Sequence, residues 1–307
     1  MVKGLLEAGY GVVRYDNLEH GHRDALVGGD FVEGDIADQS LVRQTIERYR
    51  VAAVMHFASY IEVGESVSDP IKYYRNNVAA TVQLLEVMRA AGVHRFIFSS
   101  SAAVYGEPST DKLSESHPKA PLNPYGHSKW IIEQVLGGMD AAYAFRSVSL
   151  RYFNAAGADP DGRLGERHEP ETHLIPLVLK AAAGTRPNIK VFGNDYDTTD
   201  GTCVRDYVHV TELCAAHLLG LEWLLDGGAT NAFNLGNGFS VREVISAAER
   251  VTGHPISVID YPRRFGDPAR LVADSTRAQA ELGWKPRYNE LDVIIRHAWQ
   301  WEQRLPA

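Results

Sequence analysis

Segments with the hydrophobic pattern of strands alternate with segments whose apolar residues recur at helical spacing along the first half of the chain. Short runs rich in β-branched and aromatic residues predict strands at 11–17, 30–36, 52–59, 94–101 and 145–154. Apolar residues at helical spacing predict helices between these strands, at 38–50, 76–92 and 124–136. Strands that alternate with helices are typical of a parallel sheet covered by helices on both faces. The pattern therefore predicts a doubly wound α/β fold.

The composition of the sequence and the length of the predicted elements change after residue 154. Residues 155–173 are rich in Gly, Asp, Pro and Glu, and shorter elements follow them. We interpret the second half as a smaller α/β lobe that is interleaved with the end of the sheet. The first predicted domain spans 1–154 and also receives about 203–236, and the second comprises 155–202 and 237–307.

Composition and charge narrow the class of protein. The 307 residues are 45% hydrophobic and 23% charged, which is typical of a soluble globular protein. The net charge of -8 comes without a long basic run, and this argues against nucleic acid or an anionic membrane as partner. Cys203 and Cys214 are too few for a disulfide framework or a structural zinc site, so we predict a reducing cytoplasm and no metal. No apolar run reaches membrane-spanning length.

The stretch NPYGHSK (123–129) is the first candidate for chemistry. Asn-Pro favours a turn, and Pro124 suits the first turn of the predicted helix. Tyr125 and Lys129 would then share one helix face. An ammonium beside a phenol lowers the pKa of the phenol, which suits proton exchange with a substrate hydroxyl. The alternative is an exposed Tyr-Lys pair on an ordinary helix.

Polar residues at the ends of predicted strands are the second candidate for a functional site. Ligands of open parallel sheets bind beyond the carboxyl ends of the strands. Asp16 stands where a dinucleotide enzyme needs a carboxylate for the adenosine ribose, although an Asp-Asn pair also forms turns. Asp35 could meet the adenine amino group, and Ser99 to Ser101 could bond a substrate oxygen or only satisfy loose backbone groups.

Longer stretches in a fixed order carry a family resemblance. They include DNLEHG (16–21), HFASYIEVGESVSDPIKYYRNNV (56–78), FSSSAAVYG (98–106), NPYGHSK (123–129), LRYFNAAG (150–157), ETHLIPLVL (171–179), VFGNDYDTTDGTCVRDYVHV (191–210), NLGNGFSV (234–241) and RRFGDPARLVADSTRAQAELGW (263–284). Together they resemble the extended short-chain dehydrogenase/reductase family, and within it the UDP-glucose (UDP-galactose) 4-epimerases. This resemblance implies a Rossmann-like sheet and NAD as cofactor.

The resemblance also implies roles for single residues. Tyr125 would be the catalytic base, Lys129 would hold the nicotinamide ribose, and Ser101 would orient the sugar oxygen. The implied cofactor-binding residues are Asp16, Asn17, Asp35, Ile36, Phe57, Ala58, Asn77, Ser101, Tyr125, Lys129 and Phe153. The implied substrate-binding residues are Asn154, His173, Leu174, Phe192, Arg205, Arg264, Asp267 and Leu271.

Two of the substrate assignments have structural alternatives. Arg205 suits a diphosphate because its planar fork donates two charge-assisted bonds, but a buried salt bridge is the competing interpretation. Phe192 could equally be a core residue. Asp16 favours NAD over NADP, because a carboxylate accepts from free ribose hydroxyls and repels a 2′-phosphate.

The implied reaction is inversion at carbon 4 of a UDP-hexose through a transient 4-keto sugar. A dehydratase or decarboxylase on the same fold is one rival, but such relatives place acidic residues after the serine motif, where this chain has Ala102 and Ala103. A non-catalytic binding protein is the other rival. Leu271 replaces a tyrosine of some relatives and leaves room for an N-acetylated sugar, so the sugar stays open between hexose, N-acetylhexosamine and pentose.

The beginning of the chain departs from the family pattern. The family starts with a strand and a Gly-rich loop that holds the pyrophosphate at a helix amino terminus. Here MVKGLLEAGY reads as the helix that follows this loop. We therefore expect a coding start further upstream and weak retention of NAD by the chain as written. The resemblance also implies a homodimer through the helices at 76–92 and 124–138.

Overall fold

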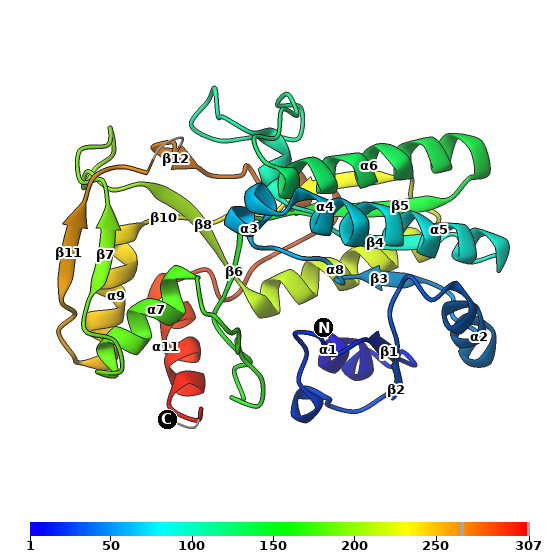
Figure 1. The fold of residues 1–307 in the computed structure, drawn as a ribbon, viewed down its shortest axis with the longest axis horizontal. Helices are drawn as coiled ribbons and strands as arrows, with labels where there is room; N and C mark the ends of the chain where they lie inside the picture. The colour runs from blue at the N-terminus through cyan, green and yellow to red at the C-terminus, as the bar shows by residue number, and fades with distance from the viewer. Residues whose placement is uncertain (265–266, 306–307) are drawn as a thin grey trace.

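A parallel four-stranded sheet forms the centre of the computed structural model, which describes residues 1–264 and 267–305. Its strand order is β3-β4-β5-β9, and Figure 1 labels the first three of these strands. The strands are β3 (Val54–His56), β4 (Arg95–Ser99), β5 (Arg146–Arg151) and β9 (Asn231–Asn234). The predicted α/β class with a parallel sheet is confirmed.

Helices cover both faces of this sheet, and β4 explains why. Phe96 and Phe98 pack against α5 (Thr81–Ala90) and α6 (Pro124–Tyr143), whereas Ile97 packs against α8 (Val210–Leu225). Successive side chains of a strand point to opposite faces, so a strand buried on both sides needs an unbroken apolar run. Figure 1 shows α5 and α6 on one side of the sheet and α8 on the other.

The amino-terminal elements form a separate pair of strands. Helix α1 (Val2–Glu7) confirms the helix predicted for the opening residues, and β1 (Val13–Asp16) follows it. Strand β1 pairs in parallel with β2 (Asp30–Glu33), which leads through α2 (Gln39–Tyr49) to β3. Within the described part of the chain, no hydrogen-bonded ladder joins β1 to β3. The predicted sheet is therefore present as two parallel ladders. A short 3-10 helix, η1 (Arg23–Ala25), lies between β1 and β2.

Helix α6 begins where the Asn-Pro turn predicted it. The side chain of Asn123 caps the helix by accepting from the backbone N–H of Gly126 at 2.9 Å, and Pro124 occupies the first helical turn. The prediction ended this helix at residue 136, before Gly137 and Gly138. The helix instead continues to Tyr143, because Met139 packs onto the core that lies under its first half.

The segment before α5 is less regular than its helical pattern indicated. Helices α3 (Val63–Ser68) and α4 (Pro70–Tyr73) run into η2 (Tyr74–Ala80), which has π-helical hydrogen bonding. Asn77 is buried in η2, where its side chain accepts from the backbone N–H of Tyr60 at 2.9 Å and donates to its carbonyl at 3.0 Å. Asn77 thus fixes the loop that follows β3.

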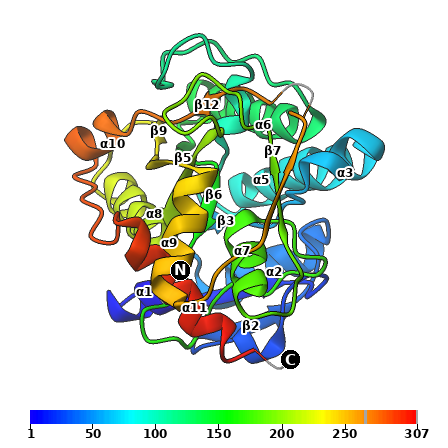
Figure 2. The same ribbon diagram turned by 90° about the vertical axis from the view of Figure 1, so that its left-hand side faces the viewer.

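The second lobe is built around β8 (Val204–His209) and a separate strand pair. Strand β8 pairs with β6 (Asn154–Ala156), β10 (Gly238–Ser240) and β12 (Arg270–Leu271), while β7 (Ile189–Phe192) pairs with β11 (Val258–Tyr261). Helices α7 (Leu174–Ala182), α9 (Val241–Thr252) and α11 (Leu291–Glu302) share one apolar core. Figure 2 shows these three helices next to one another from the side of this lobe.

The remaining elements connect the two halves of the molecule. The turn η3 (Ala102–Tyr105) follows the end of β4, and α10 (Thr276–Glu281) leads to Trp284, which packs under the main sheet. Across the described residues, none of the helices is both long and apolar enough to pass through a bilayer.

Candidate active site

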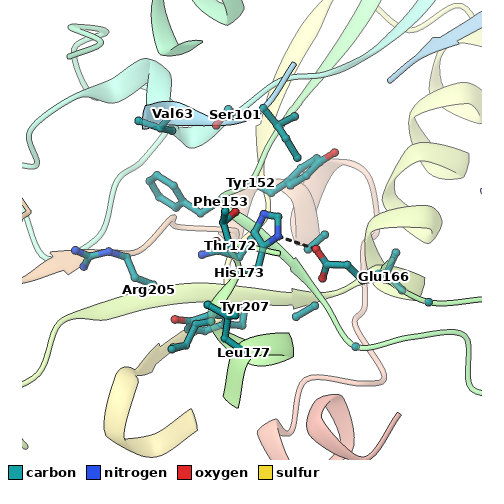
Figure 3. Close-up of a pocket in the computed structure, with 18 of the residues that line it drawn as sticks. Val63, Ser101, Tyr152, Phe153, Glu166, Thr172, His173, Leu177, Arg205 and Tyr207 are labelled. Carbon is teal, nitrogen blue, oxygen red and sulfur yellow. Dashed lines mark ion pairs between the residues drawn. The ribbon is translucent and has the colours of Figure 1, made fainter. Parts of the chain in front are cut away.

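A cavity of about 1350 Å³ lies where the main sheet meets the second lobe. Its wall combines the end of β4, the first turns of α6, the residues after β5, and side chains of β7 and β8. Figure 3 labels Ser101 after β4, Tyr152 and Phe153 after β5, and Arg205 and Tyr207 on β8. Its volume is above the roughly 300–1,000 Å³ of a site for one drug-sized molecule. The cavity therefore has room for two large ligands side by side.

Tyr125, Lys129 and Ser101 meet in the wall of this cavity. The Ser101 hydroxyl accepts from the backbone N–H of Ala103 at 3.1 Å and lies close enough to the Tyr125 phenol to lower the pKa of that phenol. The Lys129 ammonium lies 5.7 Å from the centre of the Tyr125 ring and donates to the Ser99 carbonyl at 2.9 Å. Because the helix repeat places residues four apart on one face, α6 presents Tyr125 and Lys129 together, as predicted.

Burial controls the ionisation of this pair. Lys129 is only 3% exposed, and burial lowers the pKa of its ammonium to about 7. Burial also raises the pKa of the Tyr125 phenol, and the hydrogen bond with Ser101 offsets this only in part. In this structure burial therefore sets the net direction of the Tyr125 pKa shift, and the lowering expected from Lys129 stays a prediction.

Tyr152 is a cavity residue that the sequence analysis missed. Its phenol lies 2.5 Å from the Ser99 hydroxyl, at the point where β5 ends beside β4. The signal was available, because Tyr152 follows its strand in the same way as the three serines follow theirs. The cavity lining also includes Glu166, Thr172 and Tyr207. None of these three residues directly follows a predicted strand, so the sequence did not single them out.

The predicted substrate residues line the side of the cavity formed by the second lobe. The set comprises Asn154, His173, Leu174, Phe192, Arg205, Arg264, Asp267 and Leu271. Arg205 pairs with Asp267 and donates to the Pro268 carbonyl at 2.8 Å, so its competing role as a salt-bridge residue is present in this structure. The Arg264 guanidinium lies 3.9 Å above the Phe192 ring, which keeps Phe192 at the cavity wall instead of in the core.

The predicted cofactor residues divide into two groups. Phe57, Ser101, Tyr125, Lys129 and Phe153 line the cavity. Asp16, Asn17, Asp35, Ile36, Ala58 and Asn77 stand outside its described lining.

Local hydrogen bonds occupy the polar members of the second group. Asp16 accepts from the backbone N–H of Leu18 at 2.7 Å, in the turn that was the alternative interpretation. Asp35 accepts from the Asn17 side chain at 3.1 Å. Asp16, Asn17 and Asp35 are exposed at the ends of β1 and β2, so their polar atoms remain accessible to a ligand.

A cluster of histidines and carboxylates lies at one edge of the cavity. His173 Nδ1 lies 2.7 Å from a Glu166 carboxylate oxygen and 3.0 Å from one of Glu171, as the dashed line to Glu166 in Figure 3 indicates. These hydrogen bonds raise the pKa of His173 to about 10. The sequence argument against a metal considered only the cysteines and did not weigh this cluster.

Comparison with known proteins gives a consistent result. Residues 1–236 match the model of the NAD dependent epimerase/dehydratase family. The chain is 49% identical to a UDP-glucose 4-epimerase from Halalkalibacterium halodurans, over 98% of this chain and 91% of that protein.

Solved structures agree with the sequence comparison. A UDP-glucose 4-epimerase from Brucella ovis in complex with NAD is 50% identical, with a TM-score of 0.95 over 97% of this chain and 92% of that one. A UDP-Glc/GlcNAc 4-epimerase from Campylobacter jejuni is 42% identical, with a TM-score of 0.86 over 99% and 95% of the two chains.

Proposed function

Because the chain belongs to the NAD dependent epimerase/dehydratase family, we propose that it inverts carbon 4 of a UDP-hexose, interconverting UDP-glucose and UDP-galactose with NAD as cofactor. The observation that carries this proposal is the meeting of Tyr125, Ser101 and Lys129 in one cavity wall, opposite a wall that bears Arg205 and Arg264. One side thus offers proton transfer, and the other offers cations for a diphosphate.

Lys129, whose ammonium lies beside the end of β4, fits the nicotinamide half of NAD. An ammonium has three N–H donors, and Lys129 uses two of them on Ser59 and Ser99 among the described residues. A donor is therefore left for a ribose hydroxyl. When bound, NAD supplies the hydride acceptor for the sugar.

The residues of this chain then move the proton and hold the sugar. Tyr125 takes the proton of the 4-hydroxyl through its phenolic oxygen, while Ser101 orients the same sugar oxygen. When Lys129 is protonated, its charge lies 5.7 Å from the centre of the Tyr125 ring and opposes the cost that burial imposes on the phenolate form of Tyr125. Inversion requires the 4-keto sugar to present its other face, and the large cavity provides room for this turn.

The residues after the serine motif favour an epimerase over a dehydratase. Ala102 and Ala103 begin η3 beside Ser101, and an alanine cannot protonate a leaving hydroxyl. We assign NAD to residues 1–154 with about 203–236, and the UDP-sugar to 155–202 and 237–307 together with Asn154 and Arg205, which line the same cavity.

The expected assembly is a homodimer in the cytoplasm. The proposed dimer rests on the family resemblance and would form through the helices at 76–92 and 124–138. The two unpaired cysteines support a reducing compartment. Sedimentation of the purified protein tests the dimer.

Product analysis tests the proposed function directly. The purified protein, supplied with NAD, is incubated with UDP-galactose and separately with UDP-N-acetylglucosamine, and the 4-epimers are separated by chromatography. We expect UDP-glucose from the first substrate. A dehydrated or decarboxylated sugar would instead identify the rival enzyme classes, and binding without conversion would favour the non-catalytic protein.

Replacing Lys129 by methionine should change thermal stability and activity in opposite directions. The variant removes a buried ammonium, so we expect a higher Tm at pH 6 together with a large loss of turnover. The pKa of Lys129 falls from 10.5 to about 7 on folding, so the wild type gains stability as pH rises through this range. The Tm advantage of the variant should therefore shrink between pH 7 and pH 10. A constant difference in Tm would contradict the lowered pKa.

Leu271 offers a test of sugar selectivity. It lines the cavity in β12 and packs with Phe153, so a larger side chain there narrows the space beside the sugar. We expect Leu271→Tyr to lower activity on UDP-N-acetylglucosamine by about 10–200-fold, with little change on UDP-galactose. Leu271→Met, which keeps the volume, is the matched control. Equal losses on both substrates would show misfolding instead of selectivity.

A further inference from the structure

His168, Glu171 and His173 form a compact set of metal-ligand atoms at the cavity edge. One ligand atom from each residue lies within 4.8 Å of the other two. In a tetrahedral zinc site with bonds of about 2.1 Å, ligand atoms lie about 3.4 Å apart, so small side-chain rotations close this set around an ion. The three residues come from one short segment before α7, which limits the entropy lost when they converge.

Charge favours a cation at this point. Glu62, Glu166 and Glu171 surround the two imidazoles, and among the described residues their ion pairs in this cluster are with His168 and His173 alone. Three carboxylates with no lysine or arginine partner leave an excess of negative charge. A divalent ion compensates this excess better than the histidines do.

His168 provides a second, independent observation. Its Nδ1 atom is buried and has no hydrogen-bond partner in the described structure, and the nearest carboxylate oxygen of Glu62 is 3.7 Å away. A buried nitrogen without a partner costs free energy, and a metal ion is one partner that an imidazole nitrogen accepts. The unsatisfied atom therefore belongs to the same cluster as these three carboxylates.

We propose that His168, Glu171 and His173 bind a divalent transition-metal ion of the zinc class, with Glu166 as a fourth ligand. Two imidazoles and a carboxylate suit Zn²⁺, whereas Mg²⁺ prefers oxygen ligands alone. Glu62 begins α3 on the opposite side of the cavity edge and accepts from the Thr172 hydroxyl at 3.2 Å.

Equilibrium dialysis of the untagged full chain against Zn²⁺ tests the site without using activity. We expect one Zn²⁺ per chain in the wild type. His168→Ala and Glu171→Gln should weaken binding by more than the roughly 10–100-fold that the loss of an outer-shell partner costs. His127→Ala, at an exposed position on α6, is the matched control and should bind as the wild type does.

Two further measurements keep the test decisive if a variant fails to fold. Co²⁺ added to the wild type should produce the visible absorption bands of a four-coordinate ion. Zn²⁺ should also raise the Tm of the wild type and of His127→Ala, but not that of Glu171→Gln. Less than one bound Zn²⁺ per wild-type chain, equal binding by both cluster variants, or a Co²⁺ spectrum without four-coordinate bands would overturn the proposal.

Discussion

Replacing Tyr125 by phenylalanine should lower kcat for epimerisation of UDP-galactose by about 10²–10⁴-fold, the usual contribution of a general base. Phenylalanine keeps the ring in the cavity wall and removes only the phenolic oxygen. The cations that would hold the diphosphate lie on the opposite wall, so the Kd for UDP should change little. Turnover is measured by chromatography of the two sugar nucleotides, and UDP binding is measured by calorimetry.

Tyr143 provides the matched control for this prediction. It lies on the same helix, at the last position of α6, and is 50% exposed. Tyr143→Phe should therefore leave kcat unchanged. If Tyr125→Phe retained wild-type turnover, Tyr125 would not be the base. If it lost UDP binding as well as turnover, the substitution would have disturbed the cavity instead of the proton transfer.

Replacing Arg151 by methionine should lower the free energy of unfolding by about 3–5 kcal/mol, because it leaves a buried carboxylate without its partner. The guanidinium of Arg151 binds Glu133 at both carboxylate oxygens, with Nε donating at 2.9 Å, and the two side chains are only 5% and 6% exposed. Ser100 and Tyr105 complete the network at 2.5 and 2.8 Å. Urea unfolding followed by circular dichroism measures the change.

A second ion pair between the same two elements serves as the control. Arg146 at the start of β5 binds Asp140 on α6 at 2.7 Å, but these side chains are 44% and 22% exposed. Exposed pairs contribute about 0–1 kcal/mol, so Arg146→Met should have a small effect. The double variant Glu133→Leu with Arg151→Met should recover most of the lost stability. Equal losses from Arg151→Met and Arg146→Met would contradict the importance of burial.

This network also connects stability to the candidate site. Glu133 lies one helical turn beyond Lys129, which lies one turn beyond Tyr125, so all three occupy the same face of α6. Ser100 is the neighbour of Ser101, and Arg151 is the neighbour of Tyr152. The buried pair therefore holds α6 in register against the strand ends that bear the proposed catalytic side chains.

Local patterns in the sequence were sufficient to predict the α/β fold class and to predict that Tyr125 and Lys129 lie together. The run RFIFS predicts a strand buried on both faces because its side chains alternate between two apolar surroundings. The Asn-Pro turn and the four-residue spacing place Tyr125 and Lys129 on one face of a helix, since helical geometry depends only on neighbouring residues. The continuation of α6 through Gly137 and Gly138 was missed, because it depends on a core contact of Met139.

Only the tertiary structure decided how charged and polar side chains are used. The pKa of Lys129 falls because residues far away in the sequence exclude water from its ammonium, and local sequence contains no such information. Arg205 finds Asp267 across 62 positions, and His168 meets Glu62 across the edge of the cavity. Helical and strand periods are set by the backbone, whereas burial and charge partners are set by contacts that exist only once the chain has folded.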